Sequence, residues 1–147
     1  NGRQCNCGLK GCLETYASAM GVARSAKLAL QNPESKESIL HQFNIETISA
    51  KDVYDAAKQG DTTALNIFTE TGAILGKAFA DFVKFSAPEA IVLFGGMTKS
   101  KEFFHNAMVD SMNEHLMKVW KGKIKILYSS LKESDAAILG ASALAIR

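Results

Sequence analysis

Residues 13–30, near the start of the chain, carry apolar side chains close to helical spacing. The apolar positions are Tyr16, Met20, Ala23 and Leu28. Because a period near 3.6 places side chains on one face of an α-helix, this stretch is predicted to be an amphipathic helix. The dipeptide Asn32-Pro33 stops it, and the polar run 34–49 predicts a connection rather than a further helix.

Two more helices are predicted before residue 87. Ser49 can cap a helix over residues 50–59, which Gly60 ends because glycine readily adopts a left-handed conformation. Asp61 can cap a longer helix over residues 62–85. The apolar positions of this longer helix follow a period near 3.6 and predict one buried face; they are Leu65, Phe68, Leu75, Phe79, Phe82 and Val83.

After Ala87-Pro88 the pattern changes to alternating strands and helices. The continuous apolar run 90–94 is typical of a strand covered on both faces, and residues 124–128 predict a second strand. Helices are predicted over residues 100–119 and 136–146. A strand–helix–strand order implies a parallel pair with a right-handed crossover, and therefore an α/β fold.

The predicted sheet contains only two evident strands, which suggests that it is incomplete. A few short strands that the pattern does not reveal would be another explanation. The chain also begins at Asn1 rather than at a methionine, almost inside its most distinctive motif. We therefore expect residues 1–147 to form a single partial domain of a longer protein.

Composition narrows the class of protein. With 147 residues, 47% hydrophobic and 22% charged, the chain has the make-up of one globular domain. Its formal charge of +2 comes from lysines and arginines spread thinly along the chain, which gives no support for a nucleic-acid surface. The apolar runs are too short to cross a bilayer and no charged leader precedes one, so no membrane role is expected.

The three cysteines of the chain lie together at Cys5, Cys7 and Cys12, with Gly8 and Gly11 allowing tight turns between them. Such clustering excludes a distributed disulfide framework. It indicates a metal-binding loop in a protein of a reducing compartment, which is the cytoplasm. Zinc favours four sulfur or nitrogen ligands in a tetrahedron, so the loop needs one more donor, for which histidine is the leading candidate. Free thiols in a surface loop are the alternative.

The histidines of this chain are weak candidates for that fourth ligand. They are His41, His105 and His115, and all lie far downstream on or near predicted helices. Each is interpreted as an ordinary surface or packing histidine.

Other candidate positions allow both structural and functional interpretations. Glu14 stands in the first turn of a predicted helix, where a carboxylate favours the positive end of the helix dipole. Gly95 and Gly96 follow a strand directly, where glycines serve either for a turn or for the close approach of backbone amides to a ligand. Gly72 and Gly76 are interpreted mainly as close-packing positions on the long helix, with lining of an adenosine site as the alternative.

Residues 2–14, continuing into residues 16–18, resemble the zinc motif of the ROK family of sugar kinases and sugar-responsive repressors. Further stretches extend the resemblance over nearly the whole chain; they are residues 57–61, 72–76, 88–96 and 136–141. The resemblance implies an α/β fold that forms the C-terminal lobe of an actin-like, ribonuclease-H-like ATPase, with parallel strands and covering helices.

The resemblance also assigns roles to residues. It makes Cys5, Cys7 and Cys12 ligands of a structural zinc, whose fourth ligand is a histidine that falls before Asn1. It makes Glu14 an acceptor of hydrogen bonds from sugar hydroxyls, and it assigns Gly95 and Gly96 to ATP contact. The catalytic aspartate and the first phosphate-binding loop belong to the preceding half, so this part alone is expected to be inactive.

The function implied is an ATP- and magnesium-dependent sugar kinase, glucokinase-like, that phosphorylates a hexose or an N-acetylhexosamine. Its partners would be a small sugar and ATP, in a homodimer or homotetramer. A sugar-sensing repressor of the same family is the alternative, and only then would DNA be a partner. A free-standing zinc module that binds another protein fits the α/β remainder poorly. The sequence does not distinguish among glucose, fructose, N-acetylglucosamine and N-acetylmannosamine.

Overall fold

The computed structural model of the chain describes residues 2–131 and 133–145. Helices dominate the first half, and strands alternate with helices after residue 88, as the α/β prediction requires. The α-helices are α1 (Glu14–Ala17), α2 (Ala19–Ala29), α3 (Ala50–Lys58), α4 (Thr62–Ser86), α5 (Lys101–His115) and α6 (Glu133–Ala145). The strands are β1 (Ala90–Leu93) and β2 (Lys125–Tyr128), and the 3-10 helices are η1 (Pro33–Ser35), η2 (Ile39–Gln42) and η3 (Gly96–Ser100).

The predicted caps of α3 and α4 are confirmed. Ser49 forms a full capping box at the start of α3. The buried carboxylate of Asp61 accepts a hydrogen bond from the Ala64 amide at 2.8 Å, which begins α4. It also accepts hydrogen bonds from Ser38 Oγ at 3.1 Å and from the Ile39 amide at 2.7 Å. A buried carboxylate with three donors is well satisfied, so Asp61 joins η2 to the long helix.

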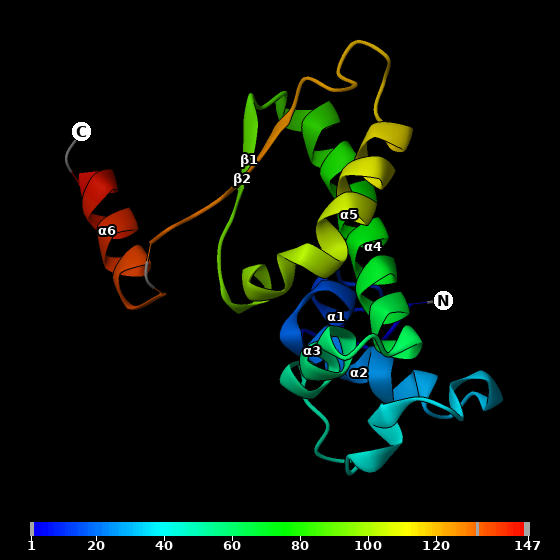
Figure 1. Cartoon of the computed structure of the whole chain (residues 1–147). Coiled ribbons are helices and arrows are strands. Elements are labelled where there is room, and N and C mark those ends of the chain that lie inside the picture. The colour runs from blue at the N-terminus through cyan, green and yellow to red at the C-terminus, as the bar shows by residue number, and fades with distance from the viewer. Residues whose placement is uncertain (1, 132, 146–147) are drawn as a thin grey trace.

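Helices α4 and α5 pack along each other and form the centre of the molecule (Figure 1). Glycines on α4 make this close packing possible. A Cβ atom added to Gly76 would lie 2.7 Å from the Met112 nitrogen, and one added to Gly72 would lie 3.1 Å from the Met108 nitrogen. The backbone oxygens of Phe104 and Met108 lie closer still to the atoms added at Gly72 and Gly76, too close for a side chain, so the two backbones meet where the glycines stand. The close-packing interpretation of these glycines is confirmed.

The single helix predicted over residues 13–30 is wrong, because Ser18 interrupts it. Ser18 has extended backbone angles, φ −105° and ψ 172°, and its side chain accepts a hydrogen bond from the Gly21 amide at 3.0 Å. The resulting corner brings α1 against α2. A Cβ atom on Gly21 would lie 2.6 Å from the backbone carbon of Tyr16, so the corner requires glycine at this position.

Strands β1 and β2 pair in parallel as predicted, with Ala90 opposite Lys125 and Leu93 opposite Tyr128. One face of this pair packs on the core. The other face carries Val92 and Leu127, which are 60% and 47% exposed. The expectation that the first strand is covered on both faces is therefore not met in the part of the chain that the structure describes.

Helix α6 stands apart from the helical body, with the two strands between it and the α4–α5 pair (Figure 1). Its large apolar side chains Ile138, Leu139 and Leu144 are exposed. The end predicted for this helix, Ile146, lies outside the described residues.

Helix α5 ends at His115, earlier than predicted, and Val119 beyond it is exposed. No helix in residues 2–131 and 133–145 has the length and apolarity needed to cross a membrane.

Candidate metal and ligand site

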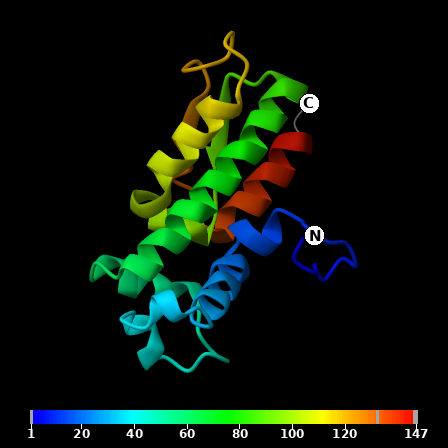
Figure 2. The same ribbon diagram turned by 90° about the vertical axis from the view of Figure 1, so that its right-hand side faces the viewer.

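The N-terminal loop folds back on itself as a small hairpin beside α1 (Figure 2). Gln4 and Lys10 form an antiparallel bridge, and the Cys5 amide donates to the Leu9 carbonyl oxygen at 2.9 Å. Gly8 turns the hairpin with a φ of 90°, a value that residues other than glycine rarely adopt. The hairpin places the thiols on neighbouring parts of the backbone.

The three predicted cysteines come together in this hairpin. Cys7 Sγ lies 3.5 Å from Cys12 Sγ, and the Sγ atoms of Cys5, Cys7 and Cys12 all lie within 4.8 Å of one another. Sulfurs bound at about 2.3 Å to one tetrahedral zinc lie roughly 3.8 Å apart, so the cluster has the spacing of a thiolate metal site. It is the one such group of histidine, cysteine or acidic side chains within the described ranges. The thiols are therefore close enough to hold a metal.

The thiols affect one another's protonation. The hydrogen bond from the Leu9 amide, followed by those from Cys5 and Cys12, lowers the pKa of the Cys7 thiol. The hydrogen bond with Cys7, followed by that with Cys5, raises the pKa of Cys12 to about 11. Cys7 is thus the thiol that loses its proton more readily than Cys12. Because the thiolate is the form that binds metal, Cys7 is better prepared than Cys12 to bind one.

The histidines of the chain make other contacts. His41 Nε2 lies 3.3 Å from Ser35 Oγ, and His105 Nδ1 lies 2.8 Å from Tyr128 Oη. His115 Nδ1 lies 2.8 Å from a backbone oxygen of its own helix. None belongs to the thiol cluster, as the sequence interpretation expected.

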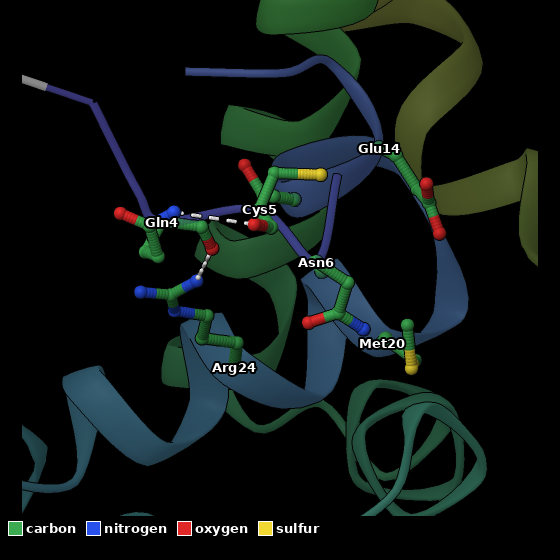
Figure 3. Close-up of a pocket in the computed structure, with 8 residues that line it drawn as sticks. Gln4, Cys5, Asn6, Glu14, Met20 and Arg24 are labelled. Carbon is green, nitrogen blue, oxygen red and sulfur yellow. Dashed lines mark hydrogen bonds between the residues drawn. The ribbon is translucent and has the colours of Figure 1, made fainter. Parts of the chain in front are cut away.

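Glu14, the first residue of α1, lines a cavity of about 210 Å³ beside the hairpin (Figure 3). The lining residues are Gln4, Cys5, Asn6, Glu14, Thr15, Met20, Gly21 and Arg24. Across the described residues, the Glu14 carboxylate makes no hydrogen bond or ion pair. It is also the only carboxylate that lines this cavity in the described part of the chain. The cavity therefore offers an open acceptor for a polar ligand.

The polar neighbours of Glu14 in this cavity were not singled out from the sequence. Arg24 projects from α2 and donates to the Gln4 carbonyl oxygen at 2.8 Å, and Asn6 lies on the hairpin between two cysteines (Figure 3). Asn6 could have been noticed from its place inside the cysteine motif. Arg24 gave no such signal, because its approach to the hairpin depends on the corner at Ser18.

Gly95 and Gly96 follow β1, as predicted, but they do not line the Glu14 cavity. Gly95 has a φ of 106°, and its carbonyl oxygen accepts hydrogen bonds from the Thr98 amide at 3.0 Å and Thr98 Oγ1 at 2.7 Å. The parallel register with β2 places the pair beyond the carboxyl ends of both strands. In parallel sheets this is the edge at which ligands bind.

Known proteins of one family match this chain over nearly its whole length. The model of the ROK family matches residues 1–147. A glucokinase of Thermotoga maritima is 32% identical over 144 residues, which are 98% of this chain and 45% of that protein. The DNA-binding transcriptional repressor Mlc of Escherichia coli is 28% identical over 143 residues, 97% of this chain and 34% of the repressor. The chain thus spans less than half the length of these relatives.

The fold is also shared with solved structures. The crystal structure of a ROK family glucokinase from Streptomyces griseus, in complex with glucose and AMPPNP, has a TM-score of 0.80 and 29% sequence identity. The match covers 97% of this chain and 47% of that one. This likeness confirms the predicted α/β architecture of an actin-like ATPase lobe. The chain belongs to the ROK family.

Proposed function

We propose that this chain is the sugar- and nucleotide-contacting C-terminal part of an ATP-dependent kinase for a hexose or N-acetylhexosamine. The observation that carries the proposal is the carboxylate of Glu14, which is open to a cavity and held next to a thiol cluster. A sugar hydroxyl needs an acceptor held in a fixed place, and a metal loop provides such rigidity. The similarity to a glucokinase supports a sugar as the ligand.

The proposal includes a further segment that completes the sheet. The outer face of β1 and β2 exposes Val92 and Leu127, and α6 exposes apolar side chains on a helix that stands apart. Surfaces of this kind are normally covered in a complete domain.

Phosphoryl transfer also needs a carboxylate that accepts the hydroxyl proton. We expect this catalytic aspartate to lie outside this chain, which is therefore expected to be inactive alone.

The metal proposed for the cysteine cluster is zinc in a structural role. Three thiolates are soft donors that suit zinc, and their spacing fits a tetrahedral site. The fourth ligand would be a histidine of the full-length protein that precedes Asn1. Bound zinc would fix the hairpin and, through Cys12, the start of α1 where Glu14 stands.

The substitution Cys7→Ser in the full-length protein is expected to lower zinc affinity by roughly a hundredfold or more, because it removes one of the ligands. Metal content per chain, measured by mass spectrometry after equilibration with a chelator, tests this. Asn6→Ser changes the neighbouring residue of the same hairpin and should leave zinc in place. Wild-type protein without zinc at neutral pH, or a Cys7→Ser variant that retains it, would contradict the proposal.

Gly95 and Gly96 are proposed to face ATP, which would bind as its magnesium complex. Gly96 is the better position to test, since the positive φ of Gly95 makes any substitution there strained. Gly96→Val is expected to weaken ATP binding by about tenfold, because its side chain would occupy the space where the backbone approaches the nucleotide. Calorimetric titration with ATP tests this, with sugar affinity and melting temperature as controls. A folded variant that still binds ATP normally would show that the pair serves only as a turn.

A sugar-sensing repressor is the second candidate, because the repressor Mlc matches nearly the whole chain. The full-length protein should be mixed with magnesium-ATP and, separately, with glucose, fructose, N-acetylglucosamine, N-acetylmannosamine and xylose. Sugar-dependent formation of ADP supports the kinase. Sugar binding without ADP formation, together with sugar-sensitive binding to DNA upstream of its own gene, supports the repressor. In either case we expect a cytoplasmic protein, since free thiols persist in a reducing compartment. The family resemblance implies a homodimer or homotetramer.

A further inference from the structure

The side chain of Arg3 connects the N-terminal hairpin to the corner between α1 and α2. Its Nη1 donates to the carbonyl oxygens of Thr15 at 2.9 Å and of Gly21 at 3.3 Å. Its Nη2 donates to Ser25 Oγ at 3.0 Å. One guanidinium group therefore holds the end of α1 and two successive turns of α2.

The surroundings of Arg3 fix its side chain in this position. Its Cζ lies 4.5 Å from the centre of the Tyr16 ring, and its backbone amide donates to Tyr16 Oη at 2.9 Å. Burial lowers the pKa of the guanidinium below its ordinary value, but arginine stays protonated at neutral pH. The break at Ser18 explains the need for it, since α1 ends too early for the Thr15 carbonyl to receive a helical donor.

Glu14 lies next to the group that Arg3 holds. On one side, the Thr15 amide and Thr15 Oγ1 donate to the Cys12 carbonyl oxygen at 2.9 and 2.7 Å. On the other side, the Thr15 carbonyl is bound by Arg3. Because the Glu14 carboxylate has no bond of its own to the described residues, its direction depends on the backbone at this point.

We infer that Arg3 is a positioning residue that fixes Glu14 for sugar binding, separately from the metal. Arg3 does not line the Glu14 cavity, so it acts through Thr15 rather than by touching the ligand. The inference rests on the proposed function, because it takes Glu14 to be the acceptor for the sugar. It adds a second anchor for that acceptor, made by a residue that is not a metal ligand.

The test compares Arg3→Met and Arg3→Lys in the full-length protein, with calorimetric titration of glucose or of whichever panel sugar the wild type binds. Arg3→Met is expected to raise the sugar Kd at least tenfold, while ATP affinity and zinc content stay unchanged. The sugar Kd of Arg3→Lys should lie between those of wild type and Arg3→Met, because one ammonium group can reach one carbonyl but cannot span both helices. The control is Lys27→Met, which removes another cation of α2 that donates to a backbone carbonyl, that of Glu46 at 2.7 Å. It should leave the sugar Kd unchanged.

A double variant separates this inference from the sugar-site assignment. If Arg3 acts through Glu14, then Arg3→Met should add little to the loss already caused by Glu14→Ala. A sugar Kd within twofold of wild type in Arg3→Met, or losses that multiply in the double variant, would overturn the inference. Normal sugar binding in Glu14→Ala would overturn both the inference and the assignment of Glu14. Should Arg3→Met fail to fold, Ser25→Ala removes one acceptor of Arg3 and is expected to raise the sugar Kd by twofold to fivefold; no change would overturn the inference.

Discussion

The substitution Gly76→Ala is expected to destabilise the protein by about 3 kcal/mol, the upper part of the range for overpacked cores. A methyl group at this position would lie 2.7 Å from the Met112 nitrogen and 2.9 Å from Ser111 Cβ. The backbone of α5 cannot yield without moving the fully buried Met108 and Met112 side chains. The higher helix propensity of alanine offsets only about 1 kcal/mol, so the clash decides the sign.

Urea unfolding at 25 °C measures this effect, and α6 offers a matched control. Gly140 is also a helical glycine, but a Cβ atom added to it would have no neighbour within 4 Å. Measured on residues 1–147, without the further segment proposed above, Gly140→Ala should therefore leave the free energy of unfolding unchanged or raise it by up to about 1 kcal/mol. Equal stability of Gly76→Ala and wild type would mean that α4 and α5 do not need to meet at this glycine.

Local signals in the sequence predicted where α3 and α4 begin, whereas α6 begins at Glu133 rather than at residue 136. Ser49 and Asp61 were identified as caps because a capping side chain bonds to amides only a few residues away. The long apolar period predicted α4 because it reports burial along a single element, and Phe68 and Phe79 are buried, although Phe82 of the same predicted face is 52% exposed. The break at Ser18 was missed, since the corner depends on the contact of Gly21 with Tyr16 and on a guanidinium from the hairpin.

Prediction of the sheet had a different limit. The run of apolar residues over β1 matches a strand buried on both sides, and the sequence alone does not tell which segments cover it. In the structure one face packs on the core, while Val92 on the other face is exposed. The strand and its parallel partner were thus predictable from pattern and order. The apolar pattern does not identify the segment that packs on its second face.

The candidate site was predictable only where its residues are close together in the sequence. Cys5, Cys7 and Cys12 are neighbours in sequence, so glycine-permitted turns are enough to bring their sulfurs together. Arg24 reaches the same cavity from another element. Its direction follows from the angle between α1 and α2, which no spacing rule describes.

The substitution Glu14→Ala in the full-length protein is expected to weaken sugar binding by tenfold to a hundredfold, while it changes stability little. Losing a charged acceptor of a sugar hydroxyl costs about 1.5–3 kcal/mol of binding free energy. The effect on folding is smaller. Glu14 is exposed and α1 has only four residues, so its interaction with the helix dipole is worth well under about 1 kcal/mol. Sugar calorimetry and thermal unfolding of the same samples measure the two effects.

Two further variants show what the carboxylate contributes. Glu14→Gln keeps the shape and one acceptor oxygen but removes the charge, so its sugar affinity should lie between those of wild type and Glu14→Ala. Glu114→Ala removes an exposed carboxylate on α5, away from the cavity, and should leave sugar affinity unchanged. A Glu14→Ala protein that melts earlier and binds sugar normally would show that Glu14 serves the helix rather than the ligand. In that case the open carboxylate would not be the sugar acceptor, and the cavity beside the hairpin would lose its proposed role.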